Sequence, residues 1–95
     1  KDHQIKHMGY RIELGEIESA LNLHKSIFES LVIYNKIDDY LGEIVAYVAG
    51  ESNLNITEII TFLSSKIPKY MIPSKVKILP KLPKNSNGKI DRNAF

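Results

Sequence analysis

An amphipathic segment in the second half of this 95-residue chain constrains the fold more than any other feature. Its apolar side chains recur at the spacing of one helix face: Ile56, Ile59, Ile60, Leu63 and Ile67. Asn55, followed three residues later by Glu58, has the pattern of a capping box, and Pro68 ends the helix. Because such a helix must bury its apolar stripe, the rest of the chain has to supply an apolar partner surface.

The partner surface is predicted to be a small mixed β-sheet. Residues 30–35 and 43–49 are β-branched and aromatic runs of strand length, separated by a polar turn at residues 36–42. Residues 75–79 alternate polar and apolar side chains, as expected of a half-buried strand. Together these segments can present one apolar face to the helix.

Two further elements precede these strands. Short extended segments at residues 4–8 and 10–14 meet at Gly9, which predicts a tight hairpin or a bulged turn. Residues 15–23 carry apolar side chains at helical spacing and predict a second amphipathic helix. Three acidic residues near its start are expected to serve helix capping and solubility: Glu13, Glu16 and Glu18. The predicted fold class is therefore α+β: a small mixed sheet with an N-terminal β-hairpin, covered by two amphipathic helices, with an irregular carboxyl-terminal lysine loop.

Charge is distributed unevenly along the chain, although the formal net charge is only +2. Residues 1–65 contain five Lys/Arg and ten Asp/Glu, a balance of −5, whereas residues 66–95 contain eight Lys/Arg and one Asp, a balance of +7. A basic carboxyl end suits an anionic partner. Nucleic acid is one such partner, but the basic region has only Tyr70 and Phe95 as aromatic residues and offers no visible platform for stacking bases. For this reason, nucleic acid is the less favoured anionic partner.

The residue composition excludes several other functions. The chain contains no cysteine, which excludes disulfides, thiolate metal sites and cysteine nucleophiles. Its histidines are expected to lie on the surface and to form no metal site: His3, His7 and His24. No apolar run approaches membrane-spanning length, and the first residues do not resemble a signal peptide. We expect a cytoplasmic protein without a membrane partner.

The last sixteen residues form the lysine loop. Pro80 and Pro83 remove backbone donors, and Asn87-Gly88 is a strong turn signal, so we expect this tail to lie outside the core. Lys89 stands directly after the turn. A lysine presented from a turn is a long cation that can reach phosphate or carboxylate oxygens. On these residues alone, a solvated basic tail is the simpler interpretation.

Two blocks of sequence gain meaning when they are read together. Residues 2–18, Asp-His-Gln-Ile-Lys-His-Met-Gly-Tyr-Arg-Ile-Glu-Leu-Gly-Glu-Ile-Glu, and residues 87–92, Asn-Gly-Lys-Ile-Asp-Arg, are joined through residues 69–73, Lys-Tyr-Met-Ile-Pro. As a set they resemble the carboxyl-terminal subdomain of adenylate-forming enzymes, a superfamily of acyl-CoA synthetases, luciferases and nonribosomal peptide synthetase adenylation domains. They are most similar to the amino-acid-activating branch, which comprises peptide-synthetase modules and D-alanine–carrier-protein ligases. The resemblance covers residues 1–95, as one lid subdomain.

The resemblance implies a role for each motif residue. Lys89 matches the catalytic lysine of the family, which contacts the substrate carboxylate and the α-phosphate of ATP. Asn87 and Gly88 match the loop that presents it. Asp2 matches the hinge about which the subdomain rotates.

The same resemblance assigns a second arrangement of the subdomain. Lys6, Gly9 and Arg11 then line the path of a phosphopantetheine thiol, where a glycine leaves the path open. Lys6 and Arg11 are equally compatible with ordinary solvated strand positions, and Gly9 with an ordinary hairpin turn.

The implied function is that of a ligase component. It would form an acyl-adenylate from ATP and a small amino or carboxylic acid, then pass the acyl group to the phosphopantetheine thiol of a carrier protein or of coenzyme A. ATP and Mg2+ would be bound mainly by a large amino-terminal adenylating domain, whose motifs are not among these residues. The isolated chain would have no appreciable activity. The alternative function is a non-catalytic basic module that docks an acidic protein or nucleic acid.

Overall fold

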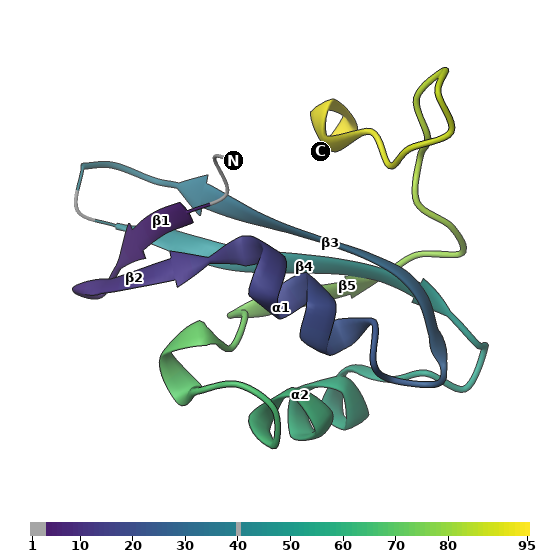
Figure 1. Cartoon of the computed structure of the whole chain (residues 1–95), viewed down its shortest axis with the longest axis horizontal. Coiled ribbons are helices and arrows are strands. Elements are labelled where there is room, and N and C mark those ends of the chain that lie inside the picture. The colour runs from purple at the N-terminus through teal and green to yellow at the C-terminus, as the bar shows by residue number, and fades with distance from the viewer. Residues whose placement is uncertain (1–3, 40) are drawn as a thin grey trace.

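The computed structural model of the chain describes residues 4–39 and 41–95. Its helices and strands follow one another as β1 (Gln4–His7), β2 (Tyr10–Glu13), α1 (Leu14–Leu21), β3 (Ile27–Lys36), β4 (Gly42–Gly50), α2 (Ile56–Ser64) and β5 (Lys75–Ile78) (Figure 1). Short 3-10 helices occupy Lys69–Met71 and Arg92–Ala94. The predicted α+β class is confirmed.

The strands belong to two sheets. β1 and β2 pair antiparallel as a separate ribbon, with His7 opposite Tyr10. The second sheet has the order β3-β4-β5, in which β4 pairs antiparallel with β3 and parallel with β5. The parallel pair requires a long crossover, and α2 supplies it. The predicted mixed sheet and the predicted N-terminal hairpin are both present.

The turn of the β1–β2 hairpin has backbone angles that favour glycine. Its two central residues have positive φ angles, 53° at Met8 and 83° at Gly9, which is the pattern of a type I′ turn. This turn matches the right-handed twist of the strands that it joins. Met8 accepts an unfavourable conformation for a side-chain-bearing residue, so the turn stores some backbone strain.

Both helices bury their apolar side chains in one core against one face of the three-stranded sheet. The buried core residues come from α1, α2 and the sheet in turn: Leu14, Ile17, Ala20, Leu21; Ile59, Leu63; Val32, Ile44, Ala46, Val48, Val76. Ile60 is only partly buried and Ile56 is exposed. The predicted helix end at Pro68 is wrong, because α2 ends at Ser64 and Ile67 packs on the core from the turn that follows. Asn55 caps α2, since its side chain accepts a hydrogen bond from the Glu58 backbone N–H at 2.8 Å.

A buried histidine joins the ends of the two helices. The Nε2 atom of His24 lies 3.2 Å from a carboxylate oxygen of Glu58, and its Nδ1 atom accepts a hydrogen bond from the Ser26 backbone N–H at 3.0 Å. The ring also packs edge-on against Phe62. The expectation of a surface histidine is wrong at this position, because the ring is held between α1 and α2.

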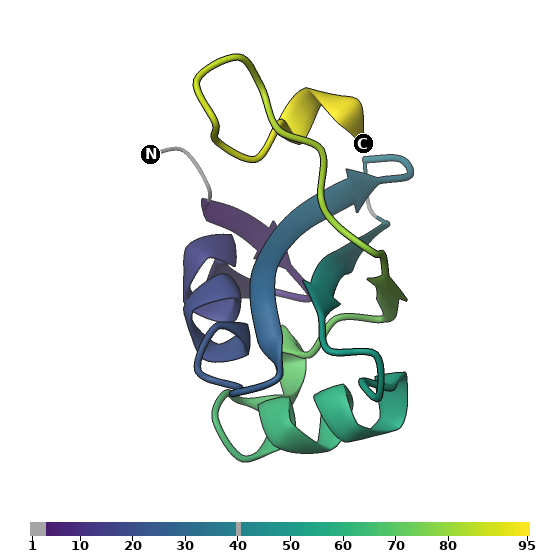
Figure 2. The ribbon, with the colours of Figure 1, turned by 90° about the vertical axis from the view of Figure 1, so that its right-hand side faces the viewer.

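The carboxyl-terminal tail packs on the opposite face of the sheet. Leu82 is 1% exposed and joins Leu31 and Ala49 in a second apolar cluster, with Ile90 and Phe95 partly buried against it. In Figure 2 the tail and α2 lie at opposite ends of the molecule. The expectation that the tail lies outside the core is therefore wrong for Leu82. None of the helices in the described ranges is long and apolar enough to cross a membrane.

Candidate functional site

The predicted lysine loop is a short hairpin organised by Asn85. The strand-like arms on either side pair through an antiparallel bridge between Lys84 and Ile90. The Asn85 backbone N–H donates to the Lys89 C=O at 2.7 Å, and the Asn85 C=O accepts from the Gly88 N–H at 3.0 Å. Gly88 has φ +83°, so the left-handed conformation that glycine favours closes the loop.

The side chain of Asn85 fixes the tip of this loop. Its Oδ1 atom accepts hydrogen bonds from the backbone N–H groups of Asn87 at 2.9 Å and Lys89 at 3.1 Å. Sequence reasoning identified Asn87 and Gly88 but missed Asn85, although an asparagine two residues before another turn residue is a known signal for this arrangement. The backbone of Lys89 is thus held at both its N–H and its C=O.

The side chain of Lys89 extends into solvent. It is exposed, and across residues 4–39 and 41–95 its ammonium group has no ion-pair or hydrogen-bond partner. A cation on an ordered backbone, with its own side chain unpaired, is available to an anion on another surface.

Glu29 anchors the first arm of the loop. One carboxylate oxygen lies 2.9 Å from the Lys84 ammonium group, and the other accepts the Leu82 backbone N–H at 3.3 Å. The hydrogen bond from Lys84 lowers the pKa of the Glu29 carboxyl below its ordinary value, with partial burial acting in the opposite direction. Glu29 follows a register shift in β3, and such irregularities redirect side chains.

Arg92 anchors the second arm. Its Nη2 atom donates to both carboxylate oxygens of Glu18 in α1, at 3.0 and 3.1 Å. Its Nη1 atom donates to the backbone C=O of Val32 at 3.4 Å, while the Val32 N–H donates to Glu18 at 2.7 Å. The expected role of Glu18 in capping and solubility is wrong, because its side chain joins the helix, the edge of β3 and the tail.

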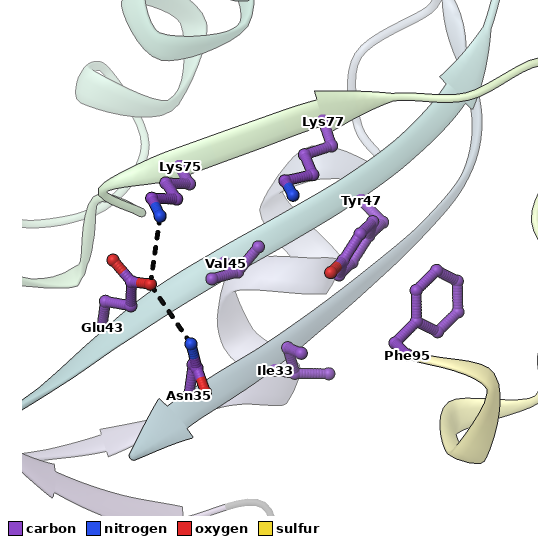
Figure 3. Close-up of a pocket in the computed structure, with 8 residues that line it drawn as sticks. All are labelled: Ile33, Asn35, Glu43, Val45, Tyr47, Lys75, Lys77 and Phe95. Atoms are coloured by element: carbon purple, nitrogen blue, oxygen red, sulfur yellow. Dashed lines mark hydrogen bonds and ion pairs between the residues drawn. The ribbon is translucent and has the colours of Figure 1, made fainter. Parts of the chain in front are cut away.

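A hollow of about 220 Å3 lies beside the tail on the outer face of the sheet (Figure 3). Phe95 approaches Tyr47 with ring centroids 4.2 Å apart. Along the sheet, Glu43 lies 3.4 Å from the Lys75 ammonium group and accepts a hydrogen bond from Asn35 at 3.3 Å. These contacts lower the pKa of the Glu43 carboxyl, the bond from Asn35 contributing most. The sequence offered no signal for this hollow, since its lining residues come from three strands and the tail.

The β1–β2 hairpin brings the other predicted residues together. Lys6 and Arg11 lie directly opposite each other in the register, and both are exposed. Two cations at one cross-strand position repel each other, so an anion near them would be favoured. Gly9 is at the tip, and a Cβ atom added there would meet nothing within 4 Å in this chain.

A mostly apolar hollow of about 460 Å3 adjoins the tip of this hairpin. His7, Met8 and Tyr10 line one side, with Tyr70 and Ile72 among the residues on the other. The Tyr10 and Tyr70 rings stack with centroids 3.8 Å apart. The stack fixes the hairpin against the segment that precedes β5.

The structure does not bring the two predicted loops together. In Figure 1 the tip of the β1–β2 hairpin and the Lys89 loop lie at opposite ends of the molecule. Asp2, the predicted hinge, lies outside the described residues. In the part of the chain that is described, no three His, Asp or Glu residues converge as a metal-binding group would.

The chain is similar to known proteins over nearly all of its length. Residues 16–89 match the family described as AMP-binding enzyme C-terminal domain. The chain is 44% identical to bacitracin synthase 1 of Bacillus licheniformis and 47% identical to gramicidin S synthase 2 of Brevibacillus brevis; each match covers 99% of this chain and 2% of the relative.

Solved structures give the same result. A four-domain nonribosomal peptide synthetase bound to AMP and glycine is 39% identical with a TM-score of 0.85, over 100% of this chain and 7% of that chain. NpsA of Klebsiella oxytoca, in complex with 3-hydroxyanthranilyl-AMSN, is 30% identical with a TM-score of 0.84, over 96% and 18% of the two chains. The chain spans only a small part of each of these proteins. It belongs to the AMP-binding enzyme C-terminal domain family.

Proposed function

We propose that residues 1–95 form the movable lid of an AMP-forming ligase that activates an amino acid or another small carboxylic acid. The observation that carries the proposal is the loop at Lys89: an exposed cation, unpaired within residues 4–39 and 41–95, on a backbone that Asn85 holds at two points. The matches to peptide synthetases, one of them solved with AMP and glycine, support this choice of reaction.

In the first half-reaction, an oxygen of the substrate carboxylate attacks the α-phosphorus of ATP. A new bond forms between that oxygen and phosphorus, and pyrophosphate leaves with the electron pair of the broken P–O bond. Two anions must approach each other for this attack, so a fixed cation beside them lowers the barrier. Lys89 would supply that cation, and Asn87 and Gly88 would allow the loop to enter the nucleotide site.

Most of the adenylating site lies outside this subdomain in our proposal. A large amino-terminal domain of the same polypeptide would bind ATP and the acid, and Mg2+ would be held by the phosphates and by that domain. The lid brings Lys89 to the site and excludes water from it. The proposed reaction consumes ATP. We also propose that the enzyme acts in the cytoplasm.

In the second half-reaction, the sulfur of a phosphopantetheine thiolate attacks the carbonyl carbon of the acyl-adenylate. A thioester forms, and AMP leaves. Lys6, Gly9 and Arg11 would line the approach of the thiol, which belongs to a carrier protein or to coenzyme A. The paired cations suit the phosphate of the phosphopantetheine arm, and the apolar hollow beside Gly9 suits its chain.

The two half-reactions need different faces of the lid. Since the tip of the β1–β2 hairpin and the lysine loop of the tail lie at opposite ends of the molecule, one site cannot receive both loops in a single arrangement. A rotation of the lid about a hinge at Asp2 would exchange them.

Lys89→Ala in the full-length enzyme tests the first assignment. Acid-dependent exchange of pyrophosphate into ATP should fall by about a hundredfold or more, as is typical when a group that stabilises transition-state charge is removed. Lys81→Ala is the matched control, because Lys81 is an exposed lysine of the same tail. Normal exchange in the Lys89 variant would show that the catalytic assignment is wrong.

Gly9→Asn and Gly9→Leu test the second assignment. Asparagine and leucine have side chains of similar size, but asparagine tolerates a positive φ better, so a loss common to both variants reports side-chain bulk and a difference between them reports backbone strain. Both variants should slow thioester formation more than they slow pyrophosphate exchange, and leucine should have the larger effect. Equal losses in both half-reactions would contradict the account of two arrangements.

A further inference from the structure

We propose that Arg92 and Glu18 are positioning residues for Lys89: their ion pair sets the direction in which the lysine loop leaves the lid. The inference rests on the proposed catalytic role of Lys89 and extends it to two residues that do not touch the reacting atoms. It follows from contacts between segments that are 74 residues apart in the sequence.

The pair has a geometry that fixes orientation as well as distance. Nη2 of Arg92 donates to both oxygens of Glu18 within 3.1 Å, while Nη1 donates to the Val32 C=O. The planar guanidinium is therefore held by a carboxylate and by a backbone carbonyl at once. A lysine at position 92 could keep the charge but could not make the same set of bonds.

Both acceptors sit on rigid supports. Glu18 lies in α1, which packs on the core, and its Oε2 atom accepts the Val32 N–H at 2.7 Å. β3 is an edge strand, so Val32 would otherwise leave its N–H and C=O without a strand partner. Glu18 and Arg92 bond to these two backbone groups, so the position of β3 determines the position of the tail at Arg92.

Hydrogen bonds within the loop couple the position of Lys89 to that of Arg92. Asp91, adjacent to Arg92, donates its backbone N–H to the Pro83 C=O at 2.9 Å, which ties the two arms together. Lys84 and Ile90 pair one residue closer to the tip of the loop, and the Asn85 side chain bonds to the backbone of the tip itself. The loop from Pro83 to Asp91 therefore moves as one unit.

The first arm alone would leave this unit free to pivot. Glu29 contacts Lys84 and the Leu82 N–H, both on that arm. The Arg92–Glu18 pair supplies a second point of attachment on the other arm. Two attachments, one on each arm, define the direction of the loop. This direction matters for the reaction because a displacement of about 1 Å at a reacting group lowers the rate on the order of a hundredfold.

The test uses the full-length enzyme and measures the two half-reactions separately. Arg92→Ala should lower kcat for pyrophosphate exchange about tenfold or more, with Arg92→Lys between Arg92→Ala and the unmodified enzyme. Thioester formation from supplied acyl-adenylate should keep its normal rate, because that step does not use Lys89. A loss of folding would lower both rates, which distinguishes it from mispositioning.

A matched control removes an ion pair elsewhere on the sheet. Lys75→Ala breaks the Lys75–Glu43 contact of 3.4 Å without touching the tail, and both half-reactions should keep their normal rates. Glu18→Gln should reproduce the effect of Arg92→Ala in direction, since Arg92 then loses its charged partner. Pyrophosphate exchange in Arg92→Ala and Glu18→Gln equal to that of the unmodified enzyme would overturn the inference.

A double variant separates this inference from the proposal on which it rests. In a Lys89→Ala background, adding Arg92→Ala should cause no further loss of exchange, because the lysine that it positions is gone. A full additional tenfold loss would show that Arg92 acts independently and would overturn the positioning role. If Lys89→Ala alone has no effect, the proposed function fails, whatever Arg92 does.

Discussion

Truncation of Leu82 should release the tail and leave the rest of the fold in place. Leu82 is a tail residue that is only 1% exposed, and it packs against Leu31 and Ala49 in the second apolar cluster. The second cluster lies on the face of the sheet opposite the helices, so its loss leaves their core intact. Leu82→Ala is therefore expected to raise the population of a state in which only the tail is detached.

The size of the effect follows from the groups that are removed. Leu→Ala deletes three carbon groups, worth about 0.8 kcal/mol each when fully buried, or about 2.4 kcal/mol in total. A cavity would add to this cost, but Ile33 and Ile90 are only partly buried and can move toward the gap. We expect about 2.5 kcal/mol, which corresponds to an increase of about 60-fold in the opening equilibrium of the tail.

Hydrogen exchange measures this opening at single amides. The backbone N–H groups of Leu82 and Asp91 are bonded to Glu29 and to the Pro83 C=O, and they should exchange about 60-fold faster in the variant. Amides of the central strand β4 should keep their rates. Leu23→Ala is the control, because the same truncation at a residue that is 68% exposed should change little.

Two results would refute this reasoning. Unchanged exchange at Leu82 and Asp91 would mean that apolar burial does not hold the tail on the sheet. An equal acceleration of tail and β4 amides would mean that the tail and the core open only together.

Three further predictions concern local features. Met8→Asn should raise the free energy of unfolding by about 1 kcal/mol, measured in urea, because asparagine tolerates the positive φ; an unchanged midpoint would contradict stored strain. Asn55→Ala should cost about 1 kcal/mol in the same assay and Asn55→Ser much less, since serine can still cap Glu58 N–H; equal losses would argue against the cap. Because Lys84 lowers the pKa of Glu29, the carboxylate stabilises the fold above its ordinary pKa of 4.5, and this contribution is lost as the pH falls through the lower folded value. Glu29→Gln should therefore weaken the fall in urea midpoint between about pH 6 and about pH 3, and an identical fall would contradict this role.

Local features of the fold could be predicted because their causes are local. The apolar stripe of α2, the cap at Asn55 and the turn at Gly9 each depend on residues within one or two turns of chain. Spacing along the sequence is enough to place them. The family could be identified for a related reason, since its motifs are short runs of adjacent residues.

Several individual residues could not be assigned from the sequence. Glu18 has the pattern of an ordinary first-turn acid, His24 that of a helix-end residue, and Leu82 that of an isolated leucine between prolines. A single side chain has no periodicity, so nothing in the sequence separates a buried residue from a solvated one. Only the path of the chain shows that His24 meets Glu58 and that Leu82 meets Leu31.

The sequence by itself determined the helices, the strands, the hairpin turn and the presence of one lysine after a glycine turn. The tertiary structure decided where that lysine points. The tail returns across the sheet, and Arg92 meets Glu18 near the opposite end of the chain, at a contact that no local pattern encodes. Backbone conformation is set by neighbours in sequence, whereas the position of a charged group is set by neighbours in space.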